Sequence, residues 1–315
     1  MKSLWTTLHD ILTIIANKGH IPTKEIDLNK AIVYANKGKF KKAIRVLTKI
    51  ITVNPKYADA FCNRANAYFK IFDYHSAITD YTRAIELDAT RADAFYNRGN
   101  AYFEQFDYQS AISDYTRAIE LDATHADAYY KRGFALNKKG DLSAAIKDYT
   151  KAIEMNPEHA EAYNRRGKVH FDGGDFHLAE KDFSKAIQIN PRLADAFYNR
   201  GLIKSERNDQ HGAIKDYNMA IEIDPKLSGA YLCRGIAYFA VRGKYVGGEY
   251  QGKDHVDFIK AAIQDYTSAI RLDPNCDIAY HNRAVCYRMM GYFREADEDY
   301  KRSLSIIEAK GHRMR

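Results

Sequence analysis

A 34-residue repeat constrains this chain more than any other feature. Residues 58–91, ADAFCNRANAYFKIFDYHSAITDYTRAIELDATR, and residues 92–125, ADAFYNRGNAYFEQFDYQSAISDYTRAIELDATH, are identical at 27 of 34 positions. The same register extends back to a divergent copy and forward through five more, so that the repeats begin at residues 24, 58, 92, 126, 160, 194, 228 and 277. We therefore expect eight stacked repeats over residues 24–310, because a unit this short cannot bury a core alone.

Each repeat is predicted to be a pair of helices, called A and B below. The eighth position of the repeat is Ala or Gly in every copy, and the twentieth is always Ala. Position 4 is aromatic in repeats two to eight, and position 24 is Tyr, Phe or Leu throughout. The spacing of positions 4, 8 and 11, and of positions 20, 24 and 27, is helical and not alternating. The fold class is therefore all-α, with large rings filling the space left by small residues.

Turn residues separate the predicted helices. Gly-Asp or Asn-Asp stands near positions 15 and 16 of several repeats, and proline near position 32 ends helix B. Repeats two and three break both rules, with Phe72 and Phe106 in place of glycine and Ala89 and Ala123 in place of proline. We expect the turns of these two repeats to be less sharply specified.

These residues resemble the tetratricopeptide repeats. The 34-residue period, the small eighth residue, the alanine at position 20 and the proline near the end of the repeat match that family over most of the chain. The resemblance implies a right-handed α-solenoid whose concave face is built mainly from A helices and binds peptides and proteins. It does not imply enzyme chemistry.

Paired charges run along the array. Position 7 is Arg and position 23 is Asp in repeats two to eight, whereas repeat one has Lys30 and Val46. Joint presence and joint absence predict an ion pair between helices A and B, with a structural role; ligand binding is the alternative. The pairs are Arg64 with Asp80, Arg98 with Asp114, Arg132 with Asp148, Arg166 with Asp182, Arg200 with Asp216, Arg234 with Asp265, and Arg283 with Asp299.

The resemblance implies that positions 2, 5, 6, 9, 12 and 13 of helix A face the groove. Asparagines recur at positions 6 and 9, and a side-chain amide matches the donor and acceptor of one peptide unit. This row is similar to the asparagine ladder in the repeat domain of O-linked N-acetylglucosamine transferase, which grips peptide backbone. The candidate binding residues are Asn63, Asn66, Asn97, Asn100 and Asn199, with Lys131 and Arg165 interrupting the row at position 6.

Aromatic residues accompany the amides at positions 5 and 12. They are Tyr96, Tyr130, Tyr198, Phe69 and Phe103. Such rings stack on apolar side chains of a bound segment, or else pack against neighbouring A helices. Position 2 is acidic in repeats one to six (Glu25, Asp59, Asp93, Asp127, Glu161 and Asp195), which favours a cationic or neutral ligand. The alternative is that these acids only complement the helix dipoles.

Charge is concentrated at the N-terminal end. The net charge is +7, and residues 1–57 hold 11 Lys and Arg against 3 Asp and Glu. That segment could attract nucleic acid, anionic lipid or an acidic partner. The alternative is a solvated helix face, because no aromatic residues alternate with the basic ones.

Other site classes find little support. The four cysteines form no CxxC pair, and no Cys/His cluster has zinc-ligand spacing. No motif for hydrolase or metalloprotease chemistry is present. We expect a cytoplasmic location, no cofactor, no metal and no membrane span.

Three segments lie outside the regular array. Residues 1–23 are expected to contain a capping helix, with an apolar stripe over residues 4–17 whose rival role is membrane contact. Repeat seven carries 15 extra residues near 241–256, expected to form a flexible surface loop. Within it, Gly247, Gly252 and Lys253 match the skeleton of a phosphate-binding loop, but Asp254 replaces the required Ser or Thr and no strand is expected before it. Residues 311–315 are a basic tail, and Leu304, Ile306 and Ile307 are candidates for self-association.

Together these features predict a non-catalytic adaptor that binds an extended segment of another protein. Two alternatives stay open: association with nucleic acid or an acidic partner through the basic end, and a self-assembling structural component. No small-molecule substrate is expected.

Overall fold

The computed structural model describes residues 23–241, 244–246, 249–251 and 255–312. The expected capping helix over residues 4–17 and residues 313–315 of the basic tail lie outside this range. The chain divides into two compact units, Met1–Asn156 and Pro157–Arg315, each described by itself below.

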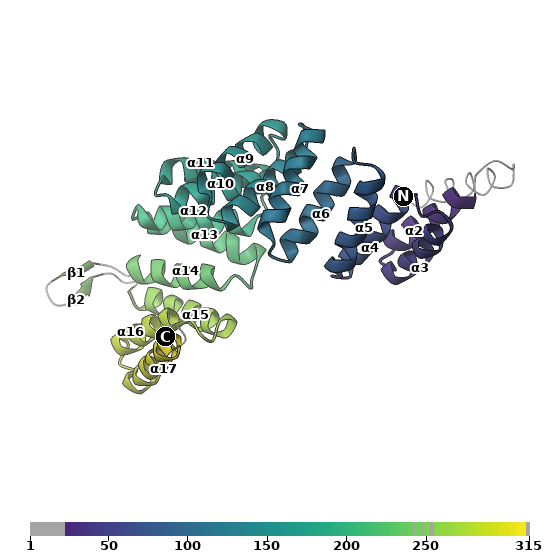
Figure 1. Ribbon diagram of the computed structural model, residues 1–315. Helices are drawn as coiled ribbons and strands as arrows, with labels where there is room; N and C mark the ends of the chain where they lie inside the picture. The colour runs from purple at the N-terminus through teal and green to yellow at the C-terminus, as the bar shows by residue number, and fades with distance from the viewer. Residues whose placement is uncertain (1–22, 242–243, 247–248, 252–254, 313–315) are drawn as a thin grey trace, which may run out of the picture. The chain divides into compact units, whose positions relative to one another are not determined.

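The first unit contains four helical hairpins. Its helices are α2 (Thr23–Asn36), α3 (Phe40–Val53), α4 (Ala58–Lys70), α5 (Tyr74–Leu87), α6 (Ala92–Glu104), α7 (Tyr108–Leu121), α8 (Ala126–Lys138) and α9 (Leu142–Met155). Consecutive helices pack as antiparallel pairs, and each pair packs on the next through its second helix (Figure 1).

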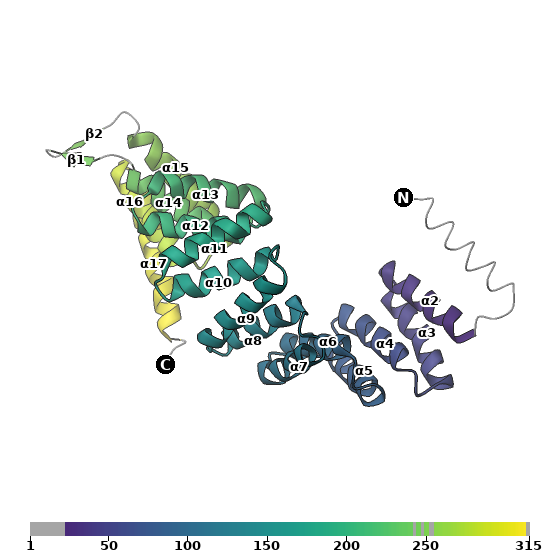
Figure 2. The ribbon, with the colours of Figure 1, turned by 90° about the horizontal axis from the view of Figure 1, so that it is seen from above.

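The second unit repeats this plan. Its helices are α10 (Ala160–Asp172), α11 (Phe176–Ile189), α12 (Ala194–Glu206), α13 (Gln210–Ile223), α14 (Ser228–Val241), α15 (His255–Leu272), α16 (Asp277–Met289) and α17 (Phe293–His312). Figure 2 shows the tandem order of the helices from a second direction. Sixteen helices in the described residues form eight hairpins, which confirms the predicted all-α repeat fold.

Rings and small residues interlock inside each hairpin. The Tyr115 ring is fully buried and lies against Gly99, where an added Cβ would stand 2.8 Å from Tyr115 Cε1. At Gly201 the same addition would stand 2.6 Å from Tyr217 Cε1. The eighth position is therefore small because helix B places a ring directly over it.

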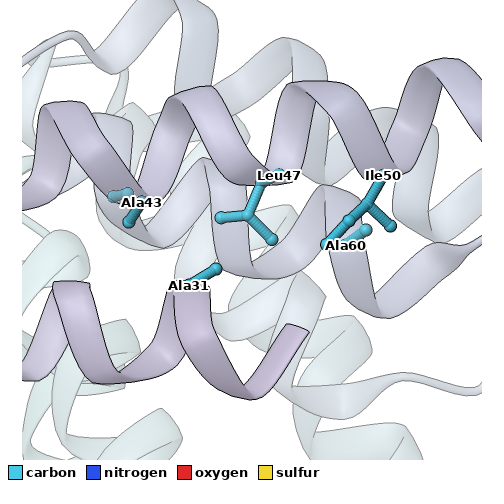
Figure 3. Close-up of a cluster of buried hydrophobic side chains, with 6 residues drawn as sticks. Ala31, Ala43, Leu47, Ile50 and Ala60 are labelled. Atoms are coloured by element: carbon cyan, nitrogen blue, oxygen red, sulfur yellow. The ribbon is translucent and has the colours of Figure 1, made fainter. Parts of the chain in front are cut away.

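The first hairpin uses an aliphatic version of this core. Leu47 occupies the place of the ring and is 1% exposed. It packs with Ala31, Ala43, Ile50 and Ala60, as Figure 3 shows. With Ala67, this cluster joins α2 and α3 to α4.

The A-to-B turns of repeats two and three differ from our expectation. Phe72 and Phe106 adopt left-handed backbone with φ of 63° and 62°, as Gly140 does with φ of 87°. The main-chain hydrogen bonds also match, because Asp73 N donates to Tyr68 O at 3.0 Å and Asp141 N donates to Leu136 O at 3.0 Å. The prediction of loosely specified turns was wrong: the phenylalanines accept the glycine conformation.

Aspartates then begin the B helices. Asp73, Asp107 and Asp141 each accept a hydrogen bond from the backbone N–H three residues later, at 3.1, 3.1 and 3.0 Å. Such N-caps satisfy donors that the first helical turn leaves unpaired.

The B-to-A connections of repeats two and three are also regular. Asp88 Oδ1 accepts from Thr90 N at 3.0 Å and from Thr90 Oγ1 at 2.6 Å. Asp122 and Thr124 repeat the arrangement. The repeats that carry proline have the same side-chain turn, since Asp224 Oδ1 accepts from Lys226 N at 3.0 Å. The turn is therefore kept where proline is missing.

The insertion of repeat seven is not a plain loop. It contains β1 (Lys244–Val246) and β2 (Glu249–Gln251), which pair antiparallel with Tyr245 opposite Tyr250. Our expectation that no strand precedes Gly247 was wrong. A phosphate-binding loop leads from a strand straight into a helix, whereas here β2 lies inside the matching stretch.

Candidate peptide-binding groove

Four of the candidate asparagines line one open cavity in the first unit. The cavity has a volume of about 470 Å³ and lies between helices α2, α4 and α6. Asn63 and Asn66 come from α4, and Asn97 and Asn100 from α6, since positions 6 and 9 of the A helix share a face. Phe69 and Lys70 complete the wall nearest the turn.

Tyrosine hydroxyls orient the position 9 amides. Tyr81 Oη donates to Asn66 Oδ1 at 2.5 Å, and Tyr115 Oη donates to Asn100 Oδ1 at 2.9 Å. Burial raises the pKa of both tyrosines well above the usual range, so the hydroxyls stay protonated donors at neutral pH. With Oδ1 occupied, each amide keeps its Nδ2 group as a donor, although the Asn100 side chain also hydrogen-bonds Tyr96.

The position 6 amides behave differently from one another. Asn63 is half-buried, and its Nδ2 donates to the main-chain oxygen of Asp59 at 2.8 Å, which leaves Oδ1 as an acceptor. Positions 6 and 9 together thus offer acceptors and donors on one wall, as a peptide backbone requires.

Asn199 does not present its amide in this way. It is 8% exposed, and its Nδ2 donates to Asn164 Oδ1 at 3.3 Å. The amide instead ties α12 to α10. Asn164 stands at position 5, where sequence reasoning looked for rings, so this pairing was missed.

The position 5 tyrosines are half-buried between helices. Tyr96 lies 5.9 Å from Tyr115 and 4.8 Å from His125, measured between ring centroids. Tyr130 lies 6.0 Å from Tyr149, and Tyr198 lies 6.1 Å from Tyr217. Each ring covers the buried tyrosine of its own repeat, which matches the packing alternative more than the ligand-stacking one.

Of the two candidate phenylalanines at position 12, only Phe69 lines the cavity. Phe69 lines the cavity and meets Tyr74 edge-on at 5.3 Å. Phe103 stacks on Phe134 at 5.1 Å. Lys131 on α8 and Arg165 on α10 are half-buried and do not line the described cavity.

The acidic row at position 2 is partly neutralised. The Arg91 guanidinium pairs with Asp59 and, at 3.0 Å, with Asp93. Hydrogen bonding to Asp93 raises the pKa of Arg91, although burial opposes it. Arg91, at position 34 of repeat two, therefore offsets the charge of the acidic row at Asp59 and Asp93.

The Arg and Asp residues of repeats two to eight form two-pronged pairs. Arg64 Nε donates to Asp80 Oδ2 at 2.7 Å and Nη2 donates to Oδ1 at 2.8 Å, while Asp80 is 4% exposed. Ion pairs of the same kind join all seven predicted partners. Each pair joins the A and B helices of one hairpin.

The arginines also reach the preceding hairpin. Arg98 Nη1 donates to Thr82 Oγ1 at 2.9 Å, and Arg283 Nη1 donates to Thr267 Oγ1 at 3.0 Å. The Arg98 guanidinium lies between two rings, with Cζ 5.6 Å from the Phe95 centroid and 5.9 Å from that of Tyr102. Sequence reasoning missed these contacts. The signal was position 25, which is Thr, Ser or Asn in repeats one to seven and Lys301 in repeat eight.

Comparison with known proteins decides the family. Models described as "TPR repeat" match residues 33–71, 73–105, 99–140 and 201–241, and models described as "Tetratricopeptide repeat" match residues 126–159, 160–193 and 278–310. The chain belongs to the tetratricopeptide-repeat family. No curated protein matches it.

Solved tetratricopeptide structures are similar to parts of the chain. The crystal structure of MamA shares 30% sequence identity, covers 56% of this chain and 98% of its own, and has a TM-score of 0.50. The C-terminal part of a repeat protein from Cytophaga hutchinsonii has a TM-score of 0.60 at 18% identity, with 81% and 98% covered. Cut9, in its complex with Hcn1, has a TM-score of 0.59 at 16% identity, with 90% and 53% covered. The last two show the fold alone.

The described part of the chain has neither a candidate metal site nor a candidate membrane-spanning helix. It contains no group of His, Cys, Asp and Glu side chains that could hold a metal ion. Among the helices described, none is both long and apolar enough to cross a bilayer.

Proposed function

We propose that this tetratricopeptide protein is a non-catalytic scaffold that binds an extended polypeptide in the cavity of its first unit. Tetratricopeptide repeats support a role in protein interaction, and the fold is typically non-catalytic. The observation that carries the proposal is the gathering of Asn63, Asn66, Asn97 and Asn100 on one open cavity, with two amides fixed by buried hydroxyls. Backbone recognition of this type needs no particular ligand side chain.

The contacts favour a neutral or mildly polar ligand backbone over a strongly cationic one. Arg91 balances Asp59 and Asp93 at the start of α4 and α6. Phe69, Phe40 and Ile32 give the same cavity apolar walls. We therefore assign amide hydrogen bonding as the main contribution and apolar contact with these side chains as the second.

The experiment is selection of a displayed random peptide library on the wild-type chain. The selected peptide is then titrated by calorimetry against Asn66→Ala/Asn100→Ala. Each lost hydrogen bond should weaken affinity by about 1 kcal/mol, so the double change should raise Kd by roughly tenfold or more.

Asn282→Ala is the matched control. Asn282 holds position 6 of repeat eight and lies on α16, outside the cavity. Its substitution should leave Kd unchanged. Equal affinity of the wild type and the Asn66→Ala/Asn100→Ala double variant would refute the proposal.

A further inference from the structure

Two strained and exposed phenylalanines mark a second surface on the first unit. Phe72 and Phe106 are 77% and 76% exposed and have positive φ. The same turn position holds glycine at Gly38, Gly140, Gly174 and Gly291, where positive φ brings no strain. Repeat six has Asn208 there with φ of 65°, and asparagine tolerates this backbone better than phenylalanine does. Phenylalanine carries that strain in full.

Nothing within the hairpins repays this strain by burying the rings. The Phe72 ring meets Tyr74 only edge-on at 6.3 Å, and the Phe106 ring meets Tyr108 at 6.4 Å. Each phenylalanine keeps about three quarters of its residue surface exposed. Burial within the chain does not offset the strain of these residues. A contact with another molecule better explains why phenylalanine stands there.

The two rings stand on one edge of the first unit, called the turn edge: residues 37–39, 71–73, 105–107 and 139–141. Contacts between neighbouring hairpins place these turns together. Lys139 hydrogen-bonds Gln109 at the start of α7. Tyr74, at the start of α5, lies within electrostatic reach of Glu104 at the end of α6.

The turn edge is rich in lysine. Exposed lysines in or beside its turns are Lys37, Lys39, Lys41, Lys42, Lys70 and Lys138. Three of its acids, Asp73, Asp107 and Asp141, cap helix N-termini, where the helix dipole offsets their charge. Glu104 is the remaining acid. Cations therefore dominate the field that the edge presents.

We propose that the turn edge docks on an anionic lipid surface, with Phe72 and Phe106 inserted at the headgroup boundary. Rings on protruding turns flanked by lysines have the composition of an interfacial membrane contact. Single-stranded nucleic acid is less well matched, because base stacking uses aromatic platforms inside a basic groove. The groove asparagines have no part in this contact, and Lys70 is the one turn-edge lysine that also lines the cavity.

The test is co-sedimentation of the full chain with vesicles. One set is phosphatidylcholine alone, and the other contains about one third phosphatidylserine. The wild type should bind the anionic set more strongly. Phe72→Gly/Phe106→Gly should lose at least about tenfold in partition coefficient, because two phenyl groups no longer enter the interface. This variant also suits its turns, so misfolding cannot mimic the loss.

Phe293→Gly is the matched control. Phe293 is 63% exposed at the start of α17 in the second unit, and its loss should leave vesicle binding unchanged. Asn66→Ala/Asn100→Ala should also bind vesicles normally. Absence of wild-type binding to anionic vesicles, or equal binding by the double glycine variant, overturns the proposal. So does a selective loss of single-stranded oligonucleotide binding in that variant with vesicle binding intact.

Discussion

Arg132 and Asp148 form a two-pronged ion pair, with Nε to Oδ2 at 2.7 Å and Nη2 to Oδ1 at 2.8 Å. Hydrogen bonding to Asp148 raises the pKa of Arg132, although burial opposes it. The Arg132 Nη1 also donates to Thr116 Oγ1 of the preceding hairpin at 3.1 Å. One guanidinium therefore joins α8, α9 and α7.

Removing one member of this pair should cost more than removing both. Arg132→Leu leaves the Asp148 carboxylate, only 6% exposed, without its partner, and should lower the free energy of unfolding by about 3 kcal/mol. Arg132→Leu/Asp148→Leu leaves no stranded charge and should cost clearly less. Urea denaturation followed by circular dichroism measures both. Equal losses would show that the two charges act independently.

The phenylalanine turns should become more stable with glycine. Left-handed backbone costs a non-glycine residue about 1–2 kcal/mol, so Phe72→Gly and Phe106→Gly should each raise the free energy of unfolding by roughly 1 kcal/mol. Gly140→Ala is the reciprocal control: no atom lies within 4 Å of the added Cβ, so the expected loss comes from the backbone alone. Thermal denaturation of the two glycine variants and of Gly140→Ala tests both expectations. A lower Tm in the glycine variants would contradict the strain assignment.

The glycines at the eighth position should not tolerate an added methyl group where a ring lies within 3 Å of it. Gly201→Ala places Cβ 2.6 Å from Tyr217 Cε1 and should lower stability by about 1–3 kcal/mol. Gly173→Ala is the comparison, since its Cβ would stand 3.4 Å from the backbone oxygen of Val169, an ordinary van der Waals distance. Differential scanning calorimetry on the two variants should show a lower Tm only for Gly201→Ala.

Alkaline pH should destabilise the first unit. Burial raises the pKa of the Cys62 thiol to about 12, and also raises the pKa of Tyr81 and Tyr115. A raised folded-state pKa means that the unfolded chain loses its proton first. The contribution of Cys62 is therefore complete below about pH 9 and declines as the pH rises toward 12.

The size of this effect can be isolated with Cys62→Ala. At about pH 10 the thiol should account for a loss of about 1 kcal/mol relative to pH 8, and the alanine variant should lack that portion. Urea unfolding at the two pH values measures the difference. The same slope in both proteins would exclude Cys62 as its source.

Much of the fold follows from local sequence rules. Positions 8 and 20 are small and position 24 is usually a ring. These residues contact one another when two helices pack as a hairpin, so the pattern indicates that structure. The joint occurrence of Arg and Asp signalled the pairs between helices. The Thr, Ser or Asn at position 25 of repeats one to seven carried a similar signal, but its partner lies in the next repeat, and a single repeat does not show it.

Other features depend on three-dimensional context. Asn199 stands at position 6, as Asn63 does, yet its amide donates a hydrogen bond to Asn164 of the preceding hairpin. Phenylalanine does not favour left-handed backbone, yet Phe72 and Phe106 adopt it. Main-chain hydrogen bonds to the preceding helix hold these turns. Arg91 neutralises two acids only because stacking brings α4 and α6 together. Each case turns on a contact between elements, which residue type alone does not reveal.

Side-chain amide NMR tests the groove most directly. A peptide selected on the wild-type chain is titrated into protein labelled with ¹⁵N on asparagine. The Nδ2 signals of Asn66 and Asn100 should shift in step with binding, whereas those of Asn199 and Asn282 should stay in place. Saturable binding with the Asn66 and Asn100 signals unmoved would contradict the assignment of the groove.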